Sequence, residues 1–309
     1  MKNKVSIIGA GFVGTMTAQK IVEKNLADVV LIDIIEGVPQ GKALDISQSS
    51  SLEEFDAKIT GTNDFSETED SDIVVVTAGF PRTPGMTREE LGLKNGNVVK
   101  SVTEKIRACA PECIIIIVTN PLDVMTHLAW KVSGFQDSRV VGMGGVLDTA
   151  RYKYFLAEEL NVSVKDIEAL VLGSHGDTMI PVDSYTTLKG IPVSQFIKKE
   201  NLNAIIERTK TGGAEIVKLF KSGSAWHGPS SSIVVMIEAI LRDSKRVLPA
   251  SAYLNGAYGI DGTHIGVPVK LGASGVEEIY EINLSDEELA ALRFSADITK
   301  ETFDKLRIL

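Results

Sequence analysis

The side chains best suited to acid–base chemistry lie in the second half of the sequence. His175 stands between glycines in the segment GSHGD, directly after an apolar run that predicts a strand. Catalytic groups are often found on loops at strand ends. Asp148 and Arg151 are three residues apart in a helical pattern, so they share one face. We expect the carboxylate to orient a histidine and the guanidinium to bind an anion; a structural histidine and a surface ion pair are the alternatives.

A second group of polar residues follows two apolar runs in the first half. Arg82 and Arg88 lie on a loop punctuated by proline and glycine, directly after the predicted strand Ile73–Thr77. Asn120 ends the next predicted strand, Ile114–Thr119. In open α/β sheets, ligands bind at the carboxyl ends of the strands. The loop therefore predicts a lid that carries arginines to a substrate, with a solvated basic loop and an ordinary Asn-Pro turn as the alternatives.

A glycine pattern near the start of the chain predicts a dinucleotide site. Gly9, Gly11 and Gly14 form G-x-G-x-x-G between the predicted strand Val5–Ile8 and a helical pattern. Glycines at this spacing allow a tight turn and a close approach of the backbone to a ligand, and the helix N-terminus offers N–H groups to a pyrophosphate. The alternative is a glycine turn that only packs a helix on a sheet.

The residue after the second predicted strand indicates which dinucleotide is bound. Asp33 directly follows Val29–Ile32, where a carboxylate binds ribose hydroxyls and repels a 2′-phosphate. Ile34 and Ile35 supply no cation that would receive such a phosphate. The cofactor predicted is therefore NAD rather than NADP.

The elements that must position these residues change in character along the chain. In the first half, β-branched runs alternate with amphipathic stretches, which predicts parallel strands buried on both faces between helices. The predicted strands are Val5–Ile8, Val29–Ile32, Ile73–Thr77 and Ile114–Thr119, and the predicted helices are Val13–Lys24, Pro39–Ser47 and Leu91–Ala108. The second half predicts helices at Val146–Leu160, Ala204–Lys221, Ser230–Asp243 and Asp286–Leu306, with short strands at Ala169–Leu172, Val247–Tyr253 and Gly266–Leu271. The fold class predicted is α/β, with a Rossmann domain, a doubly wound parallel sheet, over residues 1–145 and a mixed α+β substrate domain over residues 146–309.

Composition and charge exclude several classes of protein. The chain has 309 residues, of which 44% are apolar and 24% charged, as in ordinary folded proteins. A formal charge of -9 lacks the basic excess that nucleic-acid binders use, and no apolar stretch is long enough for a membrane span. The spacing of Cys109 and Cys113 matches neither a zinc site nor a disulfide framework, so we expect buried free thiols and no metal. A cytoplasmic protein with a small-molecule substrate is the prediction.

The chain resembles the NAD-dependent malate and lactate dehydrogenase superfamily in a series of motifs that occur in order. These are GAGFVG, LID, TAGFPRTPGMTR, TNP, GVLDTAR and GSHGD, and they extend over essentially the whole chain. Within the superfamily, the sequence is most similar to the bacterial malate dehydrogenases of the lactate-dehydrogenase-like type. The resemblance implies reversible oxidation of (S)-malate to oxaloacetate with NAD, a place in the tricarboxylic acid cycle, and a homotetramer built as a dimer of dimers.

The resemblance also implies a role for each residue that matches a family motif. His175 matches the proton-transfer histidine, and Asp148 the carboxylate that fixes its tautomer and stabilises the imidazolium. Arg151 matches the clamp on the substrate C1 carboxylate. Arg88 matches the lid arginine that polarises the reacting carbonyl, and Arg82 the specificity position, usually Gln in lactate enzymes and Arg in malate enzymes.

Two asparagines complete the implied site. Asn120 matches the amide that holds substrate and nicotinamide, and Asn95 is assigned with it to the cofactor. Ser174 and the segment 224–227 depart from the forms expected in close relatives, which puts the fine shape of the site in doubt. For His227 we expect a packing or interface role, with a ligand contact as the alternative, and the pair Trp226-His227 is a candidate for a subunit contact.

Three rival functions remain beside the malate reaction. An L-lactate dehydrogenase is disfavoured by Arg82. An NAD-dependent glycosidase of related fold would need metal-ligating Cys and His at the site, where neither cysteine is suitably placed. A non-catalytic NAD sensor would have no use for His175, Asp148 and three arginines in this arrangement.

Overall fold

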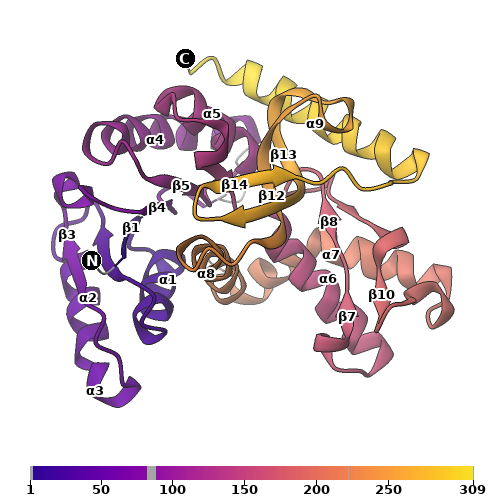
Figure 1. Cartoon of the computed structure of the whole chain (residues 1–309), viewed down its shortest axis with the longest axis horizontal. Helices are drawn as coiled ribbons and strands as arrows, with labels where there is room; N and C mark the ends of the chain where they lie inside the picture. Colours follow the sequence, from indigo (N-terminus) through magenta and orange to yellow (C-terminus); the bar gives the residue numbers. More distant parts are fainter. Residues whose placement is uncertain (1–2, 82–87, 222, 309) are drawn as a thin grey trace.

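The computed structural model describes residues 3–81, 88–221 and 223–308. The strands of its central sheet are β1 Lys4–Ile8, β2 Asp28–Ile32, β3 Ile59–Thr62, β4 Ile73–Val76, β5 Ile114–Ile117, β6 Val140–Gly142, β12 Arg246–Asn255, β13 Asp261–Gly272 and β14 Gly275–Ile279. Within the described residues they form one nine-stranded sheet in the order β14-β13-β12-β6-β5-β4-β1-β2-β3. The α/β class predicted from the sequence is confirmed (Figure 1).

The six strands of the first half form a parallel, doubly wound sheet. Reading from β3 inward, each strand pairs in parallel with its neighbour through β2, β1, β4 and β5 to β6, which is the Rossmann order. Successive residues point to opposite faces, so Ile7 and Leu31 belong to one buried cluster, whereas Ile8 and Ile32 belong to another. This two-sided burial is the reason that the inner strands read as nearly continuous apolar runs.

Helices cover both faces of the sheet (Figure 1). They are α1 Phe12–Glu23, α2 Val38–Gln48, α3 Ser50–Glu53, α4 Arg88–Cys109, α5 Leu122–Ser133, α6 Gly145–Leu160, α7 Lys199–Phe220, α8 His227–Leu241 and α9 Asp286–Leu306. Ile21 of α1 and Ile237 of α8 pack in the cluster of Ile7 on one face, and Val99 of α4 and Met125 of α5 pack in the other cluster. The C-terminal helix α9 contacts α4, α5 and β13, and so joins the two halves of the chain.

The second half extends the sheet of the first half, which the sequence did not predict. Antiparallel pairing of β12 with β6, through Ser251 and Gly142, adds the hairpin strands β12, β13 and β14 to the parallel sheet. The strands predicted at Val247–Tyr253 and Gly266–Leu271 are accordingly longer than expected. The sheet crosses the predicted domain boundary after residue 145, and that boundary stays a prediction.

Two small sheets lie outside the main one. β7 Ile167–Glu168, β10 Thr187–Leu188 and β11 Ile191–Pro192 form the first, and β8 Val171–Leu172 pairs with β9 Ile180–Pro181 in the second. The predicted strand Ala169–Leu172 is thus reduced to its last two residues. The loop between β8 and β9 carries His175.

The two cysteines are free thiols, as predicted. Cys113 is buried and Cys109 only partly so; burial raises the pKa of the Cys113 thiol to about 12, so it stays protonated near neutral pH. No group of three or more His, Cys, Asp or Glu in the described ranges is arranged to hold a metal ion. No helix in the part of the chain that the structure describes is long and apolar enough to cross a membrane.

Candidate active site

The predicted catalytic histidine lies on the loop of the β8–β9 hairpin. At the start of this loop Gly173 adopts a φ of +81° and exchanges two backbone hydrogen bonds, of 2.8 and 3.2 Å, with Gly266 of β13. A Cβ on Gly173 would lie 2.5 Å from Ile180 Cδ1, and a Cβ on Gly266 would lie 2.5 Å from the oxygen of Gly173. Both glycines are therefore required by the close approach that fixes the loop of His175 to the sheet.

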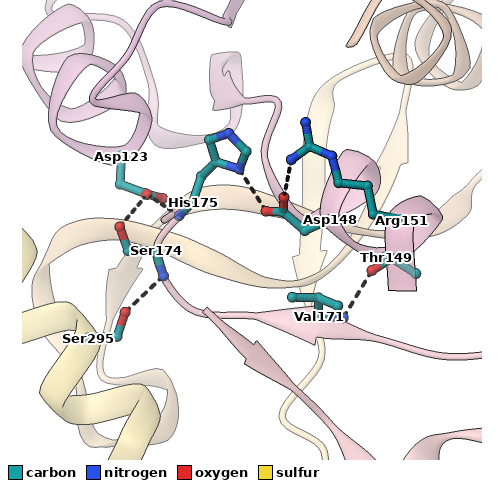
Figure 2. Close-up of polar contacts among 8 residues, drawn as sticks. All are labelled: Asp123, Asp148, Thr149, Arg151, Val171, Ser174, His175 and Ser295. Atoms are coloured by element: carbon teal, nitrogen blue, oxygen red, sulfur yellow. Dashed lines mark hydrogen bonds and ion pairs between the residues drawn. The ribbon is translucent and has the colours of Figure 1, made fainter. Parts of the chain in front are cut away.

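His175, Asp148 and Arg151 meet as the spacing and the resemblance predict (Figure 2). Asp148 Oδ2 lies 2.7 Å from His175 Nδ1, and its Oδ1 lies 3.4 Å from the NH1 of Arg151. The Asp148 side chain is only 2% exposed, so the alternative of a solvated surface ion pair is excluded. One buried carboxylate thus joins the imidazole to the guanidinium.

A hydrogen bond beside Asp148 fixes the position of helix α6 relative to the β8–β9 hairpin. The backbone N–H of Val171 in β8 donates to Thr149 Oγ1 at 2.9 Å in a buried environment, as Figure 2 shows. Thr149 follows Asp148 on the helix, and Val171 precedes His175 by one short strand. The distance between the imidazole and the carboxylate is therefore set by the backbone as well as by the side chains.

The electrostatics of the pair favour the protonated form of His175. Burial by itself would lower the pKa of His175, but the Asp148 carboxylate outweighs it, and the net pKa is raised above the usual 6.5. Because a carboxylate oxygen only accepts, we assign the Nδ1 proton to the bond with Asp148. Proton exchange is then left to Nε2.

Arg151 reaches its place beside a gap in the side chains of α7. Ideal Cβ atoms on Gly212 and Gly213 would lie 3.4 Å from Arg151 Cδ and 3.6 Å from its NH2. Of the five N–H donors of a guanidinium, the pair with Asp148 occupies one. The group is 16% exposed, which is sufficient for contact with a small ligand.

Asp123 is a residue of the site that sequence reasoning missed. It lies in the first turn of α5, is 2% exposed, and accepts hydrogen bonds at Oδ2 from the His175 N–H at 2.8 Å and from Ser174 Oγ at 2.9 Å. Burial raises its pKa, against the effect of the bonds that it accepts. Its place three residues after Asn120 was the available signal. Ser174, noted as a departure from the family form, thus supports the histidine loop.

The glycine motif takes the geometry of a phosphate-binding turn. Gly9 has a φ of +111°, and its Cβ would lie 2.7 Å from Thr77 Oγ1. A Cβ on Gly14 would overlap the carbonyl oxygen of Gly9, so α1 packs this closely only with glycine there. At Gly11, the N-cap of α1, a Cβ would meet nothing within 4 Å among the described residues. The backbone therefore leaves open space where a pyrophosphate must approach, and the residues fit the cofactor.

Asp33 connects this turn to the end of β2. Its Oδ2 accepts the Ala10 N–H at 2.7 Å and its Oδ1 accepts the Ile35 N–H at 3.1 Å, which leaves lone pairs for ribose hydroxyls. Ile34 is 89% exposed beside it. The sequence argument found no cation nearby, but Lys42 of α2 donates from Nζ to the carbonyl oxygen of Ala10. That cation was missed because a neighbour in space, rather than in sequence, supplies it.

The two asparagines lie within the described residues, whereas Arg82 and the side chain of Arg88 do not. Asn95 is buried, accepts the Phe80 N–H at 2.7 Å, and donates to the oxygens of Phe80 at 3.2 Å and Asn120 at 2.7 Å. It therefore braces the segments after β4 and β5, and its assignment to the cofactor stays a prediction. Asn120 is exposed at the end of β5. Arg82 and the side chain of Arg88, whose backbone begins α4, lie outside the described residues, and their roles stay predictions.

Trp226 packs between the two halves of the chain. Its ring stacks on Phe12 at 4.9 Å and on Phe220 at 4.7 Å between centroids, whereas His227 is exposed at the start of α8. Trp226 therefore packs against aromatic rings of both halves, and a subunit contact of the Trp226-His227 pair stays a prediction.

Two family models and several known proteins match the chain over almost its whole length. Residues 3–142 match the NAD-binding domain of lactate/malate dehydrogenases, and residues 145–307 match their alpha/beta C-terminal domain. The malate dehydrogenase of Roseiflexus sp. (strain RS-1) is 55% identical over 309 residues, 100% of each chain. The malate dehydrogenase of Cryptosporidium parvum superposes with a TM-score of 0.98 at 43% identity over 100% of each chain. A lactate dehydrogenase of Cryptosporidium parvum, complexed with lactic acid and NAD, gives a TM-score of 0.96 at 39% identity over 99% of this chain and 98% of that one. The chain belongs to the lactate/malate dehydrogenase family, whose members are NAD-dependent oxidoreductases.

Proposed function

We propose that the chain catalyses the reversible oxidation of (S)-malate to oxaloacetate with NAD. The observation that carries this proposal is the contact of the buried Asp148 carboxylate with both His175 and Arg151. With these roles, a proton acceptor and a cation that binds carboxylates would lie within reach of one small 2-hydroxy acid. Relatives of similar sequence that bear the name malate dehydrogenase support the choice of substrate.

His175 and Asp148 act as one acid–base unit. In the oxidative direction, Nε2 of His175 takes the hydroxyl proton of malate, and the hydroxyl oxygen forms the second bond of the product carbonyl. Asp148 holds Nδ1–H and stabilises the imidazolium that forms. In the reductive direction, the imidazolium returns the proton to the oxygen of oxaloacetate.

Arg151 and the dinucleotide site hold the reactants in place. Arg151 binds the C1 carboxylate of the substrate in a bidentate pair, as guanidinium geometry allows. The turn at Gly9, Gly11 and Gly14 receives the pyrophosphate at the N-terminus of α1, and Asp33 receives the ribose hydroxyls. Bound NAD supplies the acceptor for the hydride that leaves C2 of malate.

The lid arginines complete the proposal for substrate choice. Arg88 polarises the reacting carbonyl, and Arg82 pairs with the C4 carboxylate that distinguishes oxaloacetate from pyruvate. A dianion cannot be desolvated without counter-charges, so these cations let a protein of net charge -9 hold one.

The experiment that tests the proposal compares oxaloacetate with pyruvate as substrates in an NADH absorbance assay. We expect rapid NADH oxidation with oxaloacetate and little with pyruvate. His175→Asn should lower turnover by about 10²- to 10⁴-fold with NADH binding intact, because only the proton donor is lost. Lys189→Gln, a change at an exposed ion pair with Asp166, is the control and should leave turnover unchanged. Preference for pyruvate would indicate a lactate dehydrogenase, and NADH binding without turnover would indicate a sensor.

Assembly and location belong to the same proposal. Family resemblance supports a homotetramer built as a dimer of dimers, and light scattering in dilute buffer measures it directly. A dimer would contradict the finer assignment, and a monomer would contradict the analogy as a whole. The free thiols of Cys109 and Cys113 fit a reducing compartment such as the cytoplasm.

A further inference from the structure

One buried hydroxyl stands at the neck of the loop that carries His175. Ser295, on the C-terminal helix α9, is 0% exposed. Its Oγ accepts the Ser174 N–H at 2.9 Å and lies 2.8 Å from Thr178 Oγ1. Ser174 and Thr178 flank His175 on opposite sides of the loop, so a single side chain joins both (Figure 2 shows the first of these bonds).

The neck of the loop is packed around this hydroxyl. An ideal Cβ on Gly173 would lie 3.0 Å from the oxygen of Thr178 and 3.2 Å from Ser295 Oγ. The two sides of the loop and α9 thus approach one another with no room for another atom. If Ser295 lost its hydroxyl, the Ser174 N–H would be left without its partner beside an apolar methyl group, which is costly for a buried donor.

We propose that Ser295 is a positioning residue for His175. By joining Ser174 to Thr178 it holds the loop closed, so that the imidazole stands at the correct place above Asp148. The inference rests on the proposed function, in which His175 moves the proton. It assigns to α9, 121 residues further along the chain than Ser174, a part in catalysis although none of its side chains is assigned to substrate or cofactor.

The remaining supports of His175 act on other parts of the loop. Asp123 holds the backbone N–H of His175, and Asp148 holds its ring, both from helices of the sheet core. Neither bond restrains Thr178, where the chain returns to β9. Without the Ser295 hydroxyl, Thr178 loses its hydrogen bond to α9. The loop then becomes more mobile, and the imidazole of His175 shifts relative to Asp148.

The expected signature is a fall in kcat with little change in binding. Arg151 is placed by α6 and lies beside α7, and the glycine turn lies in the first half, so neither depends on Ser295. A displacement of about 1 Å in a reacting group can cost about 10²-fold in rate. For Ser295→Ala we expect kcat, calculated from the concentration of NADH-binding sites, to fall about tenfold. KM for oxaloacetate and Kd for NADH should change less than about twofold.

A matched control removes a hydroxyl from the same helix. Thr299 is 2% exposed one turn later on α9, and its Oγ1 donates only to the backbone oxygen of Ser295, at 3.0 Å, within the described contacts. Thr299→Val should leave kcat unchanged. On the loop side, Thr178→Val should lower kcat and Thr178→Ser should preserve it. The double variant Ser295→Ala with Thr178→Val should lose little more than Ser295→Ala alone, because both remove the same bond.

Hydrogen exchange measured by mass spectrometry gives a readout independent of activity. Amides of residues 171–182 should exchange faster in Ser295→Ala and Thr178→Val, and at the wild-type rate in Thr299→Val. Unchanged kcat in folded Ser295→Ala, or equal losses in Ser295→Ala and Thr299→Val, would overturn the proposal. If Ser295→Ala does not fold, the comparison of Thr178→Val with Thr178→Ser decides it. A wild-type chain without turnover would refute the proposed function, and the exchange data would still report on the loop.

Discussion

Replacing Asp148 by asparagine tests the acid–base unit most directly. The variant keeps the size of the side chain but removes the charge that lies 2.7 Å from His175 Nδ1 and 3.4 Å from the Arg151 NH1. Because Arg151 offers only donors, the amide oxygen will face the guanidinium and the NH₂ group will face the imidazole. Nδ1 must then accept a hydrogen bond, which places the proton on Nε2 and blocks its use as a base.

The size of the effect follows from the geometry. Unit charges centred about 4 Å apart interact by about 4 kcal/mol at the effective dielectric of about 20 that suits protein sites. At about 1.4 kcal/mol per tenfold change, the lost stabilisation of the imidazolium corresponds to about 10³-fold in rate. Arg151 opposes part of this attraction, so about 10²-fold is the lower bound that we expect.

The pH profile gives the sign of the effect. In the wild type the pKa of His175 is raised, so oxaloacetate reduction, which needs the imidazolium, falls only as the pH rises through a value above 6.5. In Asp148→Asn the pKa is lowered, and the fall should come at lower pH. The assay is kcat/KM for oxaloacetate across the pH range, with NADH affinity measured by fluorescence.

The control is Asp243→Asn, a carboxylate-to-amide change at a surface ion pair with Lys245. It should leave both rate and profile unchanged. A loss of less than tenfold in Asp148→Asn, with the midpoint of the profile where it is in the wild type, would refute the role assigned to Asp148.

Three further predictions concern the cofactor and substrate. Gly14→Ala should lower the melting temperature and abolish NADH binding, because its Cβ would overlap the Gly9 carbonyl oxygen. Gly11→Ala, whose Cβ has open space around it, should fold normally but bind NADH at least about tenfold more weakly. Thermal unfolding and fluorescence titration measure the two effects. Asp33→Ser should narrow the preference for NAD over NADP in initial rates, since the repelling charge is removed and Lys42 stays nearby; equal efficiency with both cofactors in the wild type would contradict this role. Arg82→Gln should lower kcat/KM for oxaloacetate by up to about 10⁴-fold and raise relative efficiency with pyruvate, and an unchanged ratio would remove Arg82 from substrate choice.

The parallel core could be predicted because its residues are buried on both faces. β2, β4 and β5 each contain an uninterrupted apolar run, β1 is interrupted only by the buried Ser6, and each strand lies within a residue or two of where it was expected. Ser285 and Glu288 form a capping box at the start of α9, with each side chain bonded to the other residue's backbone N–H, and the sequence pattern Ser-x-x-Glu is typical of such a box. Each of these patterns involves residues that are close together in the sequence, so each can be recognised without knowledge of the fold.

Some strands and one helix were not predicted, because their sequences lack the patterns typical of these elements. β3 reads Ile-Thr-Gly-Thr at the edge of the sheet, and β6 has only three residues. In α5 ten of the twelve residues are buried, polar ones such as Asp123 and His127 among them, so burial does not follow polarity in this helix. Pro249 and Pro268 lie opposite each other within β12 and β13 and disguise two long strands.

The site was predictable as a set of parts. His175, Asp148 and Arg151 each carry a sequence signal, and the family resemblance joins them. The bonds from Asp123 and Ser295 to the histidine loop span 52 and 121 residues, and no spacing rule connects positions so far apart. Supporting contacts of this kind depend on the packed structure, and a single sequence does not contain them in readable form.

The seam between β6 and β12 has a consequence for how the enzyme works. A Cβ on Gly142 would lie 2.8 Å from Ser251 Cβ and 2.5 Å from Thr126 Oγ1, so the two strands and α5 lie in close contact there. Rotation of one half of the chain against the other would break the pairing of β12 with β6, so this junction is unsuited to act as a hinge. The nucleotide turn and the histidine loop are therefore parts of one rigid frame. The positions of the nucleotide turn and of the base are therefore set when the chain folds, before cofactor and substrate bind.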